Sequence, residues 1–235
     1  MKFIIVTDFL STEALGGAEI NNKVLKNILE QKGHEVEEVK SELVTSEYIA
    51  KNNNQNFIIS NFLGLSEEAK KTLQKVKYLI YEHDHKYVKC RNPAIYKNFI
   101  VPPSEIINMD FYKNARSVLC QSNTHMSIIK KNLHLNNIIN LGGNLWTEDI
   151  LKLLEEISLA PKQDKFSILE SNIHHKNTRG SIKYCENNNF SYELVSSEKY
   201  EDFLKSLGSN TKFCFFPETP ETLSRIVVEA RMMNM

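Results

Sequence analysis

The residues best suited to chemistry lie in four short segments of the chain. The first segment reads Gly16-Gly17-Ala18-Glu19 and lies between a predicted strand and a predicted helix. Paired glycines let the backbone approach a ligand closely, and a helix N-terminus favours an anion. The segment lacks the GxGxxG spacing, so a dinucleotide site is not supported. An ordinary flexible turn fits the same residues.

The second segment, Glu82-His83-Asp84-His85, directly follows a short apolar run. Side chains at the carboxyl end of a parallel strand line the crevice where ligands bind in open α/β folds. His83 and His85, two positions apart, suggest a metal pair to which Asp84 could add a carboxylate. No second ligand cluster with suitable spacing stands out in the sequence. A histidine that contacts substrate and a loop of solvated histidines are the other interpretations.

The third segment runs from Asn172 to Gly180 and places Lys176 and Arg179 beside a glycine at the predicted start of a helix. Cationic side chains and free backbone N–H groups together bind phosphate. A solvated basic loop would show the same residues, so both interpretations stay open.

The fourth segment contains Glu221 and Glu229, which are separated by seven residues. We predict Glu221 in the loop after a strand and Glu229 two turns into the following helix. Two such carboxylates can accept hydrogen bonds from hydroxyls at two points of an extended ligand. Helix N-terminal amides near Leu223 and Ser224 can meet a diphosphate. An ordinary acidic first helical turn is the alternative.

These segments lie in a chain in which short apolar runs alternate regularly with helical patterns. Strands are predicted at 3–6, 36–39, 57–59, 78–81, 117–120, 137–141, 166–169, 192–195 and 212–216. Strands that alternate with helices indicate βαβ units and a parallel sheet. We therefore predict an α/β chain with two doubly wound, Rossmann-like domains, at 1–160 and 161–235, joined by a linker at 161–165. The segment 91–108, with three prolines, is predicted to be an irregular excursion.

Composition limits the function classes. Hydrophobic residues make up 41% of the 235 residues and charged residues 25%, which is typical of a globular protein. Lys+Arg and Asp+Glu each number 29, and zero net charge argues against a general nucleic-acid binder. No apolar run approaches the roughly 20 residues of a membrane span. Four isolated cysteines indicate a reducing, cytoplasmic location, with peripheral membrane association left open.

In chain order, the four segments resemble the retaining glycosyltransferases of family 4, which have the GT-B fold. The resemblance covers nearly the whole chain. It implies that Gly16 and Gly17 contribute to the sugar-diphosphate crevice and that His83 contacts the transferred sugar. It also implies that Lys176, and with it Arg179, binds the donor diphosphate.

By the same similarity, Glu221 faces the donor sugar and Glu229 the nucleotide ribose. The implied catalytic residues are thus His83 and Glu221, and Leu223 and Ser224 join the donor-binding set. The chain would move a sugar from a nucleotide-sugar donor to the hydroxyl of a glycan, lipid or protein acceptor. Neither a cofactor nor a metal is required, because cations neutralise the leaving diphosphate.

The sequence departs from the family pattern in three ways. Lys176 precedes Arg179-Gly180, so it stays open which of the two cations has which role at the donor diphosphate. The glycine that often follows the first Glu of the motif is absent. The last strands and the closing helix of the family have no counterpart, which predicts a partial second domain. Its open edge would expose apolar surface or self-associate.

Two other functions are compatible with the same residues. One is an inactive nucleotide-binding fragment with this fold. The other is a metal-dependent hydrolase that uses His83, Asp84 and His85.

Overall fold

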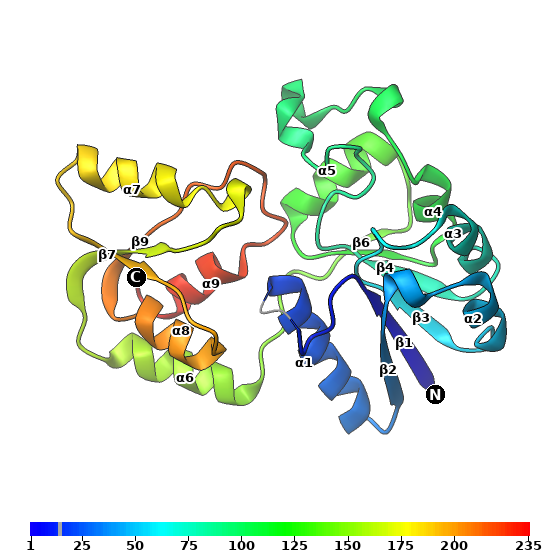
Figure 1. Cartoon of the computed structure of the whole chain (residues 1–235), viewed down its shortest axis with the longest axis horizontal. Helices are drawn as coiled ribbons and strands as arrows, with labels where there is room; N and C mark the ends of the chain where they lie inside the picture. Colours follow the sequence, from blue (N-terminus) through cyan, green and yellow to red (C-terminus); the bar gives the residue numbers. More distant parts are fainter. Residues whose placement is uncertain (14–15) are drawn as a thin grey trace. The chain divides into compact units, whose positions relative to one another are not determined.

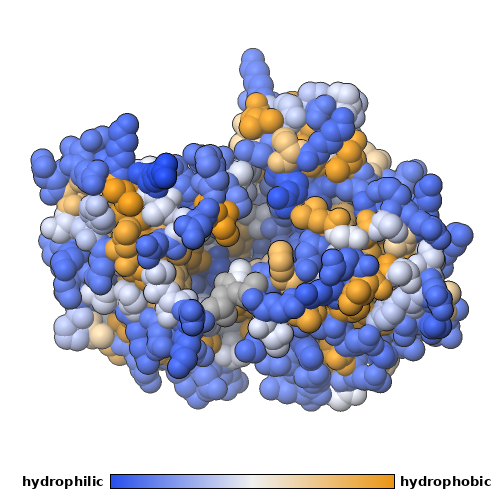
Figure 2. Space-filling model, in the orientation of Figure 1, coloured by the Kyte–Doolittle hydropathy of each residue, from blue (hydrophilic) through white to orange (hydrophobic). Residues whose placement is uncertain are grey.

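The computed structural model describes residues 1–13 and 16–235, which form two compact units, Met1–Leu145 and Trp146–Met235. Each unit contains one parallel β-sheet with helices against it (Figure 1). The predicted α/β class with two parallel-sheet units is therefore confirmed. On the face seen in Figure 2, hydrophilic residues predominate and apolar residues gather in small groups.

Unit 1 is built on a six-stranded parallel sheet with the order β2-β1-β3-β4-β5-β6. Its strands are β1 (Lys2–Thr7), β2 (Glu35–Lys40), β3 (Asn56–Ile59), β4 (Tyr78–Tyr81), β5 (Val118–Cys120) and β6 (Ile138–Asn140). All six predicted strands of this unit are present. Because every strand is parallel to its neighbours, all of their carboxyl ends reach the same edge of the sheet.

The continuous apolar run of β1 packs on both faces of the sheet. Ile4 and Val6 face the larger core, which includes Phe57 and Ile80, whereas Ile5 faces a second core. Successive side chains of a strand point to opposite faces, so a strand between two helical layers must be apolar at every position. This is why the period-two pattern is missing from β1.

Among the described residues, five α-helices belong to unit 1 and a sixth follows it in the chain. They are α1 (Gly17–Gln31), α2 (Ser46–Lys51), α3 (Glu67–Leu73), α4 (Met109–Asn114) and α5 (Asn123–Leu133) in unit 1, with α6 (Glu148–Leu159) following in the chain. Helices α3 and α6 begin at side-chain N-caps, a feature typical of Ser and Thr: Ser66 Oγ accepts from Ala69 N at 3.1 Å and Thr147 Oγ1 from Ile150 N at 3.4 Å. The helices α2 and α4 were not predicted from the sequence, because each is only six residues long.

The predicted irregular excursion lies between β4 and α4. It contains three short 3₁₀ turns, Pro93–Ile95, Lys97–Phe99 and Pro103–Glu105. Three prolines remove backbone donors and disfavour a regular helix or strand here. The excursion is tied back to the unit through Asn132 of α5, whose Oδ1 accepts from Val101 N at 2.8 Å.

Unit 2 is built on a three-stranded parallel sheet in which β8 and β9 flank β7. Its elements are β7 (Gln163–Leu169), α7 (Thr178–Asn187), β8 (Tyr192–Val195), α8 (Tyr200–Leu207), β9 (Asn210–Cys214) and α9 (Arg225–Met232). The residues predicted as a linker, 161–165, instead include the first part of β7. The predicted self-association through an open sheet edge stays a prediction.

The division between the units differs from the predicted boundary near residue 160. Helix α6 packs against α8 and α9, and its Ile150, Leu154 and Ile157 share a core with Leu204 and Leu207. The opposite face of the second sheet packs against α7 in a small core around Ile168 and Cys185. Chain order alone attached α6 to the first sheet, but its apolar face is buried against the second.

No helix in the described part of the chain is long and apolar enough to cross a membrane.

Candidate functional site

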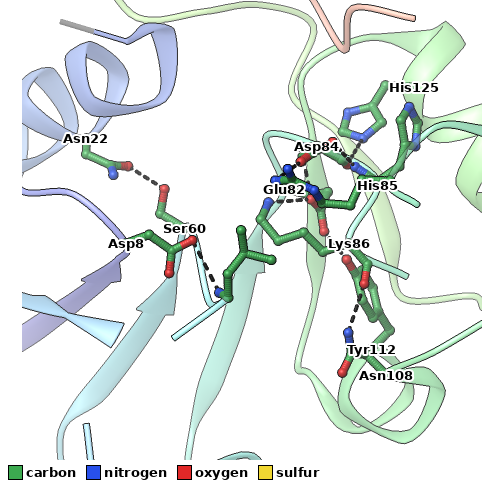
Figure 3. A network of polar contacts seen from close by, with 12 residues as sticks. Asp8, Asn22, Ser60, Glu82, Asp84, His85, Lys86, Asn108, Tyr112 and His125 are labelled. Atoms are coloured by element: carbon green, nitrogen blue, oxygen red, sulfur yellow. Dashed lines mark hydrogen bonds and ion pairs between the residues drawn. The ribbon is translucent and has the colours of Figure 1, made fainter. Parts of the chain in front are cut away.

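Polar side chains gather where the strands of unit 1 end. Asp8 follows β1, Ser60 follows β3, Glu82 follows β4, Gln121 follows β5 and Asn144 follows β6. Four of these five are buried. Figure 3 shows Asp8, Ser60 with its hydrogen bond to Asn22, and the separate hydrogen-bonded cluster around Glu82 in this region. Burial of so many polar groups at the carboxyl edge of a parallel sheet marks it as the candidate ligand-binding edge of unit 1.

Glu82 is the centre of this polar network. Its carboxylate accepts hydrogen bonds from Lys86 Nζ at 2.9 Å, from Asp84 N at 3.0 Å and from the Tyr112 hydroxyl. Glu82 and Lys86 are both fully buried, so the ion pair is shielded from water. Burial and the neighbouring Glu82 raise the pKa of the Tyr112 phenol well above its usual value, so the phenol stays a donor. The network fixes the turn that carries His83.

His83 is held by a second set of side chains. Its ring lies 4.2 Å from that of Tyr81, centroid to centroid, and it is hydrogen-bonded to Gln121. Gln121 in turn donates to Asn144 Oδ1 at 2.6 Å. Burial of the imidazole and the nearby Lys86 lower the pKa of His83 to about 3. His83 is therefore a neutral hydrogen-bonding group near pH 7 rather than a cation.

His85 does not share the surroundings of His83. Its ring lies 5.1 Å from that of His125, and both are almost completely buried. Burial lowers the pKa of His85 to about 4 and that of His125 well below its usual value. No group of three or more His, Cys, Asp or Glu in residues 1–13 and 16–235 is placed to hold a metal ion. The geometry gives the metal-pair interpretation no support.

Gly16 and Gly17 lie at the start of α1, as the sequence predicts. Gly16 is the N-cap residue and Gly17 the first helical residue. A Cβ added at Gly16 would lie 2.1 Å from Glu19 Oε2, so the missing side chain makes room for this carboxylate. Glu19 is buried, and burial raises the pKa of its carboxyl group.

In unit 2, the loops that follow β7 and β9 meet at Lys176 and Glu221. Lys176 Nζ lies 2.9 Å from Glu221 Oε1, and about a quarter of each side chain is exposed. Two further contacts join the same loops: Asn177 Nδ2 donates to Phe216 O at 2.9 Å, and Glu218 N donates to His175 O at 2.8 Å. Two predicted site residues 45 positions apart thus form one polar site at the carboxyl edge of the second sheet.

The other predicted residues of unit 2 are less closely joined. Arg179 is exposed, and no hydrogen bond or ion pair links it to another described residue. Leu223 and Ser224 are half-buried and precede α9. Ser224 Oγ is buried and has no hydrogen-bond partner among the residues that the structure describes. Ser224 has extended backbone angles, so α9 begins at Arg225, and Glu229 lies one turn into the helix instead of two.

Glu229 is the most enclosed of the predicted residues. Its Oε1 accepts from Trp146 Nε1 at 2.9 Å, from the Tyr200 hydroxyl and from Arg225 Nε at 2.8 Å. Burial raises the pKa of the Glu229 carboxyl group, and Arg225 opposes that effect. The Arg225 guanidinium lies over the Trp146 ring, 4.7 Å from its centroid, and 5.5 Å from that of Tyr200. All three donors use Oε1, so ribose hydroxyls would have to donate to Oε2.

Sequence reasoning did not identify several residues that hold these sites. Gln121 and Asn144 support His83 in unit 1, and Trp146, Tyr200 and Arg225 surround Glu229 in unit 2. The position of Gln121 and Asn144 just after predicted strands was an available signal. The sequence gives no such signal for Trp146 and Tyr200, because both lie far from Glu229 in the chain and contact it only in the folded structure.

Comparison with known proteins places this fold among the glycosyltransferases. No protein-family model matches the chain, and no curated protein matches its sequence. Solved glycosyltransferases of the GT-B type share its arrangement of elements at identities of 8–9%, which shows the fold alone.

Two of these structures were solved with UDP. One is the pneumococcal O-GlcNAc transferase GtfA in complex with UDP and GlcNAc, with 9% identity and a TM-score of 0.54 over 80% of this chain. The chain spans 42% of the length of that protein. The other is an alpha-glucosyltransferase in complex with UDP and a 13-mer DNA containing a HMU base, with 8% identity and a TM-score of 0.54. That match covers 99% of this chain and 78% of the other.

Proposed function

We propose that this chain is a glycosyltransferase that takes a sugar from a nucleotide-diphosphate donor and transfers it, with retention, to an acceptor hydroxyl. The ion pair between Lys176 and Glu221 carries the proposal, since it joins a cation and a carboxylate at the carboxyl edge of the second sheet. Ligands bind at that edge in open α/β folds. Two structures of this fold type contain UDP, which supports a nucleotide diphosphate as the donor group. Family 4 remains part of the proposal.

Each residue of unit 2 has a distinct role in this proposal. Lys176 is exposed enough to meet a diphosphate. When no diphosphate is bound, Glu221 neutralises the ammonium group of Lys176. When the diphosphate pairs with Lys176, the Glu221 carboxylate becomes available to sugar hydroxyls. Ser224 Oγ and the backbone amides near it lie at the N-terminus of α9, where an anion is stabilised.

The remaining predicted residues bind the sugar and the nucleotide. Neutral His83 donates or accepts a hydrogen bond with the transferred sugar, and Glu229 accepts from the ribose through Oε2. In the transfer, the acceptor oxygen bonds to the anomeric carbon and the nucleoside diphosphate leaves with the electron pair of the broken bond. The proton of the acceptor hydroxyl passes to the phosphate oxygen of the leaving nucleoside diphosphate. Positioning and electrostatic stabilisation supply the catalysis, and no metal takes part.

The acceptor side is assigned to unit 1, and its chemistry stays a prediction. We propose that the chain does not act as a nucleic-acid binder, because its net charge is zero, although one structure of the same fold was solved with DNA. A cytoplasmic location is also retained as a proposal.

Calorimetry with UDP, GDP, ADP and their sugar conjugates tests the donor site directly. We expect one nucleotide family to bind, and Lys176→Ala to weaken that binding about tenfold or more, because a charge-assisted contact to phosphate is lost. Lys183→Ala is the matched control, since Lys183 is an exposed lysine on α7. Failure of every nucleotide to bind, or equal binding by Lys176→Ala, would contradict the proposal.

Activity is then measured as release of the nucleoside diphosphate from the bound donor in the presence of candidate acceptors. Turnover that is lost in Glu221→Gln supports a transferase. Binding without turnover over the whole acceptor panel would instead favour a nucleotide-binding chain without transferase activity.

A further inference from the structure

The segment between β4 and α4 combines exposed apolar side chains with a local excess of positive charge. From Lys89 to Ser104 the sequence contains three basic residues and no acidic residue. The exposed fractions of Ile95, Phe99 and Ile100 are 63%, 37% and 56%. We call the exposed part of this segment, residues 89–100, together with Lys130 and Lys131 of α5, the basic-apolar projection.

The backbone holds these apolar side chains outward at a conformational cost. Asn98 and Phe99 have φ values of 56° and 61°, in the left-handed region that is uncommon for bulky residues. Asn132 Nδ2 donates to Phe99 O at 2.9 Å, and Lys131 Nζ donates to Asn98 O at 3.1 Å. Strained backbone of this kind persists only where surrounding contacts fix it, and it concentrates at functional surfaces. The apolar side chains are therefore exposed in a backbone conformation that these hydrogen bonds fix.

The charges of the projection are only partly neutralised. Lys89 pairs with Glu105 at 3.5 Å and Arg91 with Asp84 at 3.2 Å. Lys97, Lys130 and Lys131 form no ion pair with any residue in the described part of the chain. Three lysines of the projection thus have no acidic partner in the described residues, and one of them, Lys131, reaches the backbone of Asn98 beside the exposed Phe99. Apolar and hydrophilic groups lie close together on the space-filling surface of this unit (Figure 2), and the segment extends beside α5 in Figure 1.

We infer that the basic-apolar projection docks unit 1 on an anionic lipid bilayer. Aliphatic and aromatic side chains insert at the boundary between headgroups and acyl chains, while lysines pair with anionic headgroups. A nucleic acid would use the lysines but would leave Ile95 and Ile100 exposed to water, so the bilayer accounts for more of the surface. This inference goes beyond the proposed function and does not depend on it.

Sedimentation of the full chain with lipid vesicles tests the inference. The vesicles contain either phosphatidylcholine only or phosphatidylcholine with about a third phosphatidylglycerol. The test variant is Ile95→Ser/Lys97→Glu, which removes one apolar group and reverses one charge of the projection. The matched control is Leu43→Ser/Lys75→Glu, because Leu43 is 60% exposed and Lys75 is an exposed lysine elsewhere on unit 1. Circular dichroism and thermal unfolding verify that both variants are folded.

We expect the chain to bind the anionic vesicles at least tenfold more strongly than the neutral ones, and less strongly as salt rises. The projection variant should lose about tenfold or more of this binding, and the control variant should retain it. The inference is overturned if the unmodified chain stays in the supernatant with anionic vesicles, or if both variants bind equally well. Binding of a short DNA duplex that depends on the projection, without vesicle binding, would also overturn it. Nucleotide calorimetry on the same variants reports separately on the donor site.

Discussion

Arg225 and Glu229 form a buried ion pair within one turn of α9, with Nε and Oε1 2.8 Å apart and side chains only 7% and 2% exposed. The same Oε1 accepts hydrogen bonds from Trp146 and Tyr200. The second carboxylate of the sequence motif is therefore also a centre of packing in unit 2. Removing it affects both stability and ligand binding, and the two effects have to be measured separately.

Glu229→Ala should destabilise unit 2 by about 3–5 kcal/mol, because it leaves the Arg225 guanidinium buried without its carboxylate. Glu229→Gln should cost less, since its amide oxygen still accepts from Trp146. Trp146 is the only tryptophan of the chain and contacts Glu229, so its fluorescence during urea unfolding reports on this site. The exposed Glu201→Ala on α8 is the control. An unchanged transition in Glu229→Ala would show that the ion pair does not stabilise unit 2.

Lys86→Met should destabilise unit 1 by about 3–5 kcal/mol, because Glu82 would keep a buried negative charge with only hydrogen bonds to support it. The double variant Glu82→Gln/Lys86→Met should lose clearly less than the sum of the two single variants, as expected for contacting groups. Urea unfolding followed by circular dichroism measures all three. Lys51→Met, which removes a lysine from an exposed pair with Glu47, should change little. Additive effects of the two single variants would mean that the buried pair is not coupled.

The buried histidines of unit 1 should make the chain acid-sensitive. The pKa of His85 is about 4 in the folded protein and about 6.5 when unfolded. Between these values the unfolded chain binds the additional proton, so the free energy of unfolding falls as the pH falls. The loss is about 1.4 kcal/mol per pH unit for each such histidine. Asp84, Lys86 and His125 are the charged or titratable groups that affect His85.

This pH dependence is measured by urea unfolding between pH 7 and pH 5. His125→Gln keeps a donor for Asp84 O and removes one titrating group, so it should reduce the slope of stability against pH. The exposed His174→Gln serves as the control and should leave the slope unchanged. A slope that is the same in His125→Gln and the unmodified chain would exclude this buried histidine as its source.

Gly180→Ala should weaken both α7 and the site beside it. An added Cβ would lie 2.5 Å from Asn177 Nδ2 and 2.6 Å from its Oδ1, which now accepts from Gly180 N. Loss of this N-cap costs about 1–2 kcal/mol, and displacement of Asn177 also breaks its bond to Phe216 O. Trp146 fluorescence should show a lower stability and calorimetry a weaker nucleotide affinity. Lys183→Ala on the same helix should change neither. Wild-type stability and affinity in Gly180→Ala would argue against the role of this cap.

Much of the fold was predictable because its signals are local. The apolar run of β1 and the glycine pair at the start of α1 appear in the structure where the sequence places them, and Ser66 and Thr147 form the N-caps that their residue types favour. The helices α2 and α4 were not predicted, since six residues are too few for a clear helical period. The start of α9 was also placed too early, because the backbone of Ser224 stays extended.

By itself, the sequence determined the alternation of strands and helices, the two parallel sheets and the positions of most polar residues at the ends of strands. Those features follow from side-chain periodicity and from capping, which act over a few residues. Only the tertiary structure decided that α6 packs with unit 2, that Lys176 meets Glu221, and that Trp146 and Tyr200 enclose Glu229. The physical reason is that these contacts join residues far apart in the chain, and only the packing within unit 2 brings them together.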